Sequence, residues 1–110
     1  MRALTVRQPW AWLIIKGYKR IEYRSWQPGK RLRVGERFAI HAGAADWDVD
    51  DDYPQVDFPN ELHCGAIIGT VEFTGAVEPI KGRGWEWHLA KPKPCKPVDC
   101  KGKLGLWHVP

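Results

Sequence analysis

Short stretches of apolar residues run along the whole chain and predict a mostly β structure with one helix. Trp10, Leu13 and Ile14 recur at the i, i+3, i+4 spacing of a single helix face. Gly17 follows at the position where a helix commonly ends. We therefore expect one helix directly after a first strand, with Trp10 in the core. The other stretches predict strands, so that the expected strands lie at residues 3–6, 19–26, 37–42, 64–74, 85–90 and 104–109.

Two segments do not follow a strand or helix pattern. Residues 91–97 alternate Lys with Pro and predict a proline-rich, extended connection. Residues 43–63 contain an acidic cluster within 46–52 and two later prolines, which predicts a short helical turn followed by loop. The cluster lacks the glycine and the distal glutamate of a calcium loop, so we interpret it as a solvated loop of unassigned role.

Several short strands with one helix predict the α+β class, as a small closed β-barrel with short helical and loop insertions. The length of 110 residues fits one domain over 1–110, and no internal repeat is visible. A closed barrel also removes the unpaired sheet edges that are a liability in a small protein.

The composition adds a preference for acidic partners. The formal net charge is +4, and the chain contains seven tryptophans, more than a core of this size needs. Three cysteines without paired spacing argue against a disulfide framework, and we expect free thiols in a reducing cytoplasm. No apolar run is long enough for a signal peptide or a membrane span. The candidates for zinc lack the usual C-x-x-C spacing, so neither a metal nor a cofactor is expected; these candidates are His63, Cys64, Cys95 and Cys100.

The segment from Gly17 to Arg24 concentrates chemistry-bearing groups at the junction between the helix and the second strand. Lys19 and Arg24 are able to bind a phosphate or a carbonyl oxygen, and Glu22 is able to accept hydrogen bonds or serve as a general base. The alternative is a structural ion pair of Glu22 with Arg20 or Arg24 that only stabilises a strand. The spacing alone favours this structural interpretation.

A family resemblance changes that balance. Gly17, Lys19, Glu22 and Arg24 reproduce the G-x-K-x-x-E-x-R hallmark of the ASCH (activating-signal-cointegrator homology) domain family, which is part of the PUA-like superfamily. The residues before the hallmark, from Leu4 onward, resemble the lead-in of bacterial and phage members. Further matching pieces follow in order along nearly the whole chain, at residues 24–26, 40–42, 65–71, 87–89 and 105–107. The resemblance implies a PUA-like β-barrel with the hallmark residues at a cleft, and a function in binding RNA or a nucleotide-like molecule.

Five residues form the expected site. Lys19 and Arg24 would meet phosphate or carbonyl groups, Glu22 would read donor groups on a base, Trp26 would stack on the base, and His41 would touch the ligand or move a proton. Whether the domain only binds or also catalyses stays open at this point. If it catalyses, Lys19 and Glu22 are the candidate catalytic residues.

The alternative function is that of a small hydrolase. One branch of relatives deacylates N4-acetylcytidine with a Lys and a Thr three residues later, and here the Thr position holds Glu22. Another relative has been described as a ribonuclease. A third option is a protein-interaction domain without nucleic-acid binding, although no protein partner is indicated. The sequence does not identify the ligand, the oligomeric state or the pathway.

Overall fold

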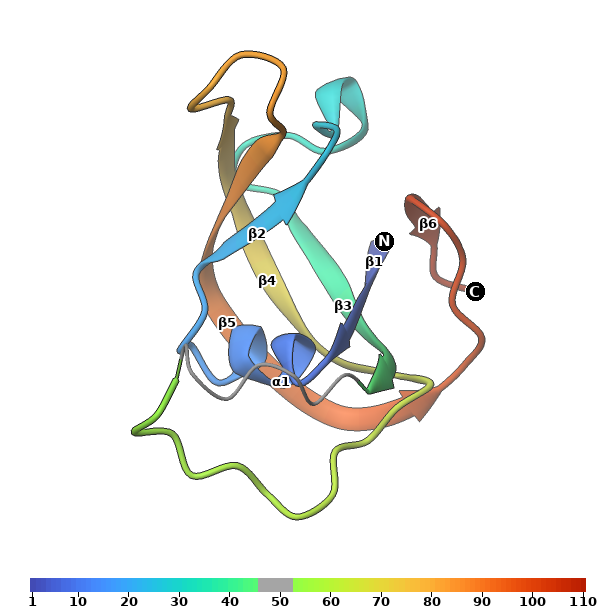
Figure 1. Ribbon diagram of the computed structural model, residues 1–110. Helices are drawn as coiled ribbons and strands as arrows, with labels where there is room; N and C mark the ends of the chain where they lie inside the picture. Colours follow the sequence, from blue (N-terminus) through green and yellow to red (C-terminus); the bar gives the residue numbers. More distant parts are fainter. Residues whose placement is uncertain (46–52) are drawn as a thin grey trace.

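The computed structural model describes residues 1–45 and 53–110, which form one mixed six-stranded sheet, one α-helix and one 3-10 turn (Figure 1). The strand order is β2-β5-β4-β3-β1-β6, with β1 parallel to β3 and the other neighbours antiparallel. The elements are β1 (Arg2–Gln8), α1 (Trp10–Ile15), β2 (Ile21–Arg24), η1 (Gly29–Arg31), β3 (Arg37–Ala45), β4 (Ala66–Val77), β5 (Trp85–Asp99) and β6 (Leu106–His108).

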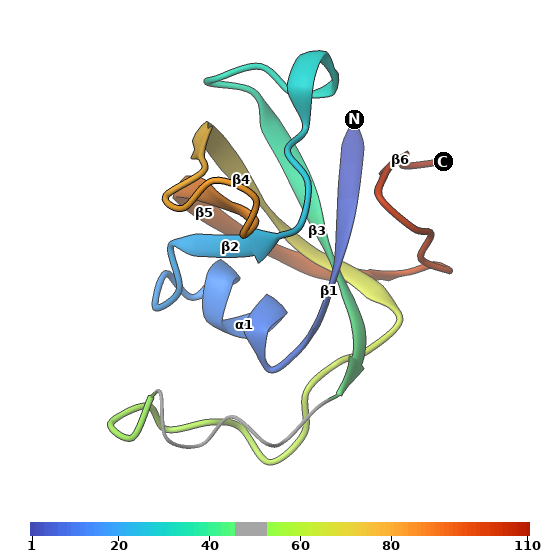
Figure 2. The same ribbon diagram turned by 45° about the horizontal axis from the view of Figure 1, so that its top comes forward.

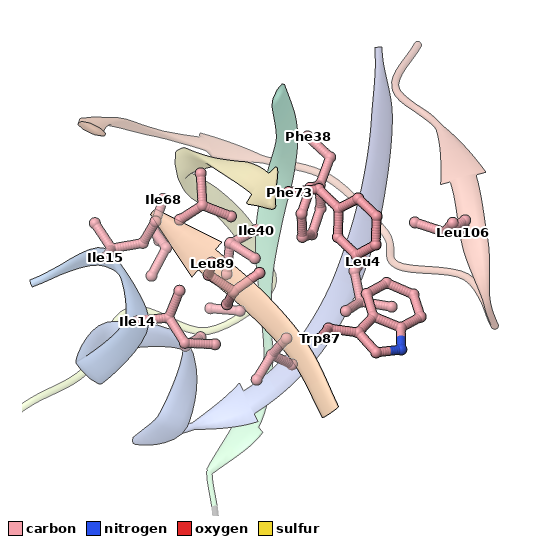
Figure 3. Packing of buried hydrophobic residues seen from close by; sticks show 14 of the residues in the cluster. Leu4, Ile14, Ile15, Phe38, Ile40, Ile68, Phe73, Trp87, Leu89 and Leu106 are labelled. Carbon is pink, nitrogen blue, oxygen red and sulfur yellow. The ribbon is translucent and has the colours of Figure 1, made fainter. Parts of the chain in front are cut away.

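The core fills the concave side of this curved sheet. The helix α1 buries Ala11, Leu13, Ile14 and Ile15, and Figures 1 and 2 both show it lying against one end of the sheet. Trp87 of β5 is fully buried among aliphatic and aromatic side chains from the other strands (Figure 3). The main cluster of buried residues also contains Leu4, Val6, Leu32, Phe38, Ile40, Ala42, Ile68, Val71, Phe73, Leu89 and Leu106.

The expected closed barrel is not confirmed. Among the described residues, β2 and β6 stand at the two ends of the strand order, and no ladder joins them. A side chain bridges part of the opening instead, because Nη2 of Arg24 on β2 donates to the backbone oxygen of Thr5 on β1 at 2.9 Å. The coarser prediction of a mostly β fold with one helix is confirmed.

Residues 91–97 are extended, as predicted, but they continue β5 and do not form a connection between strands. The strand pairs with β2 only between Trp85 and His88, and with β4 as far as Asp99. Beyond His88, the edge that faced β2 therefore has no partner among the described strands. Proline lacks an N–H and is tolerated on such an edge, so Pro92, Pro94 and Pro97 fit this half of the strand.

The described part of the expected irregular segment is a loop that crosses beside α1. Phe58 packs on Trp12 of the helix with ring centroids 5.3 Å apart, and the backbone oxygen of His63 accepts a hydrogen bond from Gln8 at 2.9 Å. The acidic cluster and the helical turn predicted around it fall on residues 46–52, outside the described residues. None of the helices in residues 1–45 and 53–110 has the length and apolarity needed to cross a bilayer.

Candidate functional site

The hallmark residues lie where the chain leaves α1 and enters β2. Gly17 adopts a φ of 85°, which favours glycine, and its N–H bonds to the Ile14 carbonyl as the helix ends. The Lys19 N–H bonds to the carbonyl of Leu13, so the chain folds back across the last helical turn. This reversal places Lys19 next to the start of β2, from which Glu22 and Arg24 extend on the same side of the strand.

Glu22 is the centre of a partly buried ion network. Its two carboxylate oxygens face two cations, with the Lys19 Nζ at 3.4 Å from Oε1 and the Arg24 Nη2 at 2.8 Å from Oε2. The Arg24 Nε also donates to Oε2 at 2.9 Å. Both Lys19 and Glu22 are at least nine-tenths buried, whereas about a quarter of the Arg24 side chain is exposed. The network thus carries one net positive charge at its exposed end.

Each cation keeps donor capacity for a further partner. The Lys19 ammonium also donates to the Ile21 carbonyl and lies 5.0 Å from the centre of the Tyr23 ring. Arg24 uses Nε for Glu22, and Nη2 for both Glu22 and the Thr5 carbonyl. Within residues 1–45 and 53–110, Nη1 has no hydrogen-bond partner, so its two N–H groups are free to meet a ligand.

Burial lowers the pKa of the Lys19 ammonium below its ordinary value of 10.5. The nearby positive charge of Arg24 lowers this pKa further, and the Glu22 carboxylate opposes both effects. A lysine with a lowered pKa is easier to deprotonate and therefore serves as a general base more readily than an exposed lysine. The local chemistry is thus compatible with anion binding and with proton transfer.

An open hollow of about 590 Å³ lies directly beside the network. Four of the five predicted site residues line it: Lys19, Glu22, Arg24 and Trp26. Sequence reasoning did not assign its other lining residues to the site, and these are Thr5, Val6, Arg7, Trp10, Tyr23 and Ser25. The three charged heads therefore contact one another and also face a space that solvent reaches.

Trp26 is half-buried at the rim of this hollow. Its ring packs edge-on against Trp87 with centroids 4.9 Å apart, and its backbone oxygen accepts the Trp87 indole N–H at 3.0 Å. The Arg31 guanidinium lies 5.1 Å from the ring centre. The ring is therefore held in place by its neighbours, as a stacking platform for a base requires.

Trp10 differs from its prediction, because it is only half-buried and lines the hollow instead of lying inside the core. The helical spacing correctly placed Trp10 on the apolar face of α1. Trp10 is the first residue of this helix, however, and at that end the helix borders the hollow.

His41 lies in a neighbouring hollow of about 450 Å³ and does not line the one beside Lys19. Its Nε2 faces the Cys100 carbonyl at 2.8 Å, and a carbonyl only accepts, so Nε2 carries the proton. Its Nδ1 lies 3.2 Å from the Thr5 hydroxyl oxygen, and that oxygen accepts the Trp107 indole N–H at 3.2 Å. His41 is therefore part of a hydrogen-bonded chain that fixes the C-terminal segment. Thr5 joins this chain to the network, because its backbone oxygen binds Arg24.

Thr5→Val is expected to lower the free energy of unfolding by about 1–3 kcal/mol, since it leaves His41 Nδ1 and the Trp107 indole N–H without their partner. Chemical denaturation of both proteins measures this difference. Thr74→Val, on an exposed position of β4, is the matched control and should change the stability by less than about 0.5 kcal/mol. Equal effects of the two substitutions would contradict the proposed role of the hydroxyl.

The described residues contain no group of three or more His, Cys, Asp or Glu side chains able to hold a metal ion. The three cysteines are free thiols. His63, which the sequence grouped with them as a zinc candidate, instead contacts Asp99 at 2.7 Å.

Comparison with solved structures identifies the class of fold. The crystal structure of ASCH from Zymomonas mobilis superimposes with a TM-score of 0.54 at 14% identity, covering 89% of this chain and 72% of that one. A crystal structure of a mutant of the same Zymomonas mobilis protein gives a TM-score of 0.59 at 14% identity, covering 89% of this chain and 74% of the other. At this level of identity the likeness concerns the fold alone.

The sequence comparison assigns the family. The model of the ASCH domain matches residues 4–97, and the chain belongs to the ASCH domain family. Activating signal cointegrator 1 from Homo sapiens is 32% identical in an alignment over 83 residues, with a coverage of 63% of this chain and 13% of that protein. The Mus musculus protein of the same name is 32% identical over 79 residues, with the same coverage. The chain thus corresponds to a small part of these relatives.

Proposed function

We propose that the hollow beside Lys19, Glu22 and Arg24 binds a nucleotide of single-stranded or looped RNA. The observation that carries the proposal is a buried carboxylate held between two cations in the wall of an open hollow, with Trp26 at its rim. The family, in which RNA binding is the expected role, supports the same conclusion.

The charges around the hollow favour an anionic ligand. Arg7, Lys19 and Arg24 line it, and Glu22 is the one carboxylate among its described lining residues. Because Glu22 is engaged by both of its neighbours, it neutralises part of their charge and leaves a net positive wall. The free Nη1 of Arg24 would meet a phosphate or a base carbonyl, and the remaining lone pairs of Glu22 would accept from a base amino group.

Trp26→Leu tests the stacking role. The substitution is expected to weaken the binding of a short single-stranded RNA by about 5–150-fold, the equivalent of about 1–3 kcal/mol for one stacked base. Titration calorimetry with an unlabelled oligonucleotide measures the affinity, and denaturation confirms that the variant is folded.

Trp12→Leu is the matched control, because Trp12 stacks on Tyr18 and Phe58 and does not line the hollow. Its affinity for RNA should stay within about twofold of the original value. A Trp26→Leu protein that binds as well as the control would remove Trp26 from the proposed site.

The lowered pKa of Lys19 favours a second candidate function, the hydrolysis of a modified nucleoside such as N4-acetylcytidine. In this role a deprotonated Lys19 would take a proton from the attacking water, with Glu22 beside it at 3.4 Å. Incubation with modified nucleosides and short RNAs, followed by mass spectrometry, reports turnover and retained ligand in one experiment. Turnover that persists in Lys19→Met would exclude this mechanism.

A further inference from the structure

Two further hollows share lining residues with the one beside Lys19. The one towards the C-terminal segment shares Thr5 and Arg24 with it, and the one towards the β4–β5 loop shares Tyr23, Arg24 and Ser25. Their volumes are about 450 and 570 Å³. Arg24 lines all three, and we refer to the three hollows around this side chain as the groove.

The two ends of the groove come from segments that are far apart in the sequence. In Figures 1 and 2 the β4–β5 loop and the chain before β6 lie on opposite sides of β1 and β2. Arg83 lines the groove at the loop end, and Lys103 lines it at the C-terminal end; both are exposed. With Arg7 in the middle hollow, each of the three parts has one exposed cation.

The backbone at both ends packs closely against the centre of the groove. Gly82 and Gly84 have φ values of 78° and 97°, and a side chain at Gly84 would approach the Arg24 carbonyl within 3.2 Å. At the other end, a Cβ on Gly102 would stand 2.7 Å from both His41 Cε1 and the Thr5 hydroxyl. Glycine is therefore required where each end approaches the centre of the groove.

We propose that the groove binds three successive nucleotides of single-stranded RNA, with the central nucleotide at Arg24 and the outer two next to Arg83 and Lys103. This inference rests on the proposed function and adds the length of the ligand and its path across the sheet. A strand is favoured over a free nucleotide because the cations repeat along the groove, as the phosphates of a strand do. Among the described residues, Glu86 is the one carboxylate that lines the outer hollows.

The experiment is titration calorimetry of the whole chain with 5′-phosphorylated oligouridylates of one to five nucleotides. The affinity is expected to rise by at least about tenfold from one to three nucleotides, and by less than about threefold from three to five. A free nucleotide that binds as tightly as the trinucleotide would overturn the inference and leave the proposed function standing. If oligonucleotides of every length fail to bind, the proposed function itself is wrong.

Charge-matched variants at the two ends locate the path. Lys103→Ala and Arg83→Ala should each weaken trinucleotide binding by about fivefold or more, and each should reduce the slope of log affinity against log salt by about 0.7. Neither should change mononucleotide binding by more than about twofold. Lys101→Ala and Lys81→Ala remove the same charge from the same segments at positions outside the groove, so they are the controls. If the groove variants behave like these controls, the strand does not follow this path.

Discussion

Glu22→Gln is expected to lower the free energy of unfolding by about 3–5 kcal/mol, although the two side chains have nearly the same shape. The substitution leaves the Lys19 and Arg24 cations beside each other without the carboxylate that compensates them, and an uncompensated buried charge is strongly destabilising. Chemical denaturation at pH 7 measures the effect. A loss of this size is a large share of the stability of a small domain.

Two comparisons make this test specific. Glu61→Gln removes an exposed carboxylate and should change the stability by less than about 0.5 kcal/mol. The double variant Glu22→Gln, Lys19→Met should be more stable than Glu22→Gln alone, because it also removes one of the two unpaired cations. A double variant that is no more stable would show that charge compensation is not what Glu22 provides.

Lys19→Met is expected to abolish most RNA affinity while keeping the fold. Loss of a charged donor costs about 1.5–3 kcal/mol of binding, or about 10–150-fold in affinity. The free energy of unfolding at pH 7 should not fall by more than about 1 kcal/mol, because Glu22 keeps its contacts with Arg24 and the burial of the ammonium is relieved. Lys16→Met, at an exposed position after α1, is the control for both measurements.

The lowered pKa of Lys19 also predicts how the stability difference between the original protein and Lys19→Met depends on pH. Between the lowered pKa and 10.5 the unfolded chain holds a proton on Lys19 that the folded chain has released. The contribution of this group to stability therefore rises with pH across that window. The stability of the original protein relative to Lys19→Met should increase between pH 7 and 10.5. A difference that stays flat or decreases would contradict the assigned direction of the pKa.

The chemistry of the site was more predictable from the sequence than its shape. The hallmark spacing placed Lys19, Glu22 and Arg24 at a helix-to-strand junction, and the structure brings these three together beside the hollow. The contact of Arg24 with the Thr5 backbone depends on how β2 approaches β1, which no local pattern encodes. The position of His41 depends on the same long-range packing. The sequence therefore predicted His41 in the same site, whereas the structure puts it in the adjoining hollow.

The fold shows the same division between local and long-range information. Alternation and helical spacing predicted the positions of most elements, since both depend on neighbouring residues. Proline content misled the prediction at residues 91–97, because the absence of an N–H excludes a residue from a central strand but not from a free edge. Whether this edge is free depends on where β2 begins, at Ile21 opposite His88, and that is settled by the three-dimensional packing.

The free edge of β5 has a consequence for encounters between molecules. An unpaired strand edge is a template on which a second chain can add its own strand, and this is a common route to aggregation. Along residues 91–97 every second or third residue is a proline that offers no N–H, and exposed lysines between them repel an identical copy. The prolines and lysines of residues 91–97 thus protect the open edge of the sheet from pairing with a neighbour.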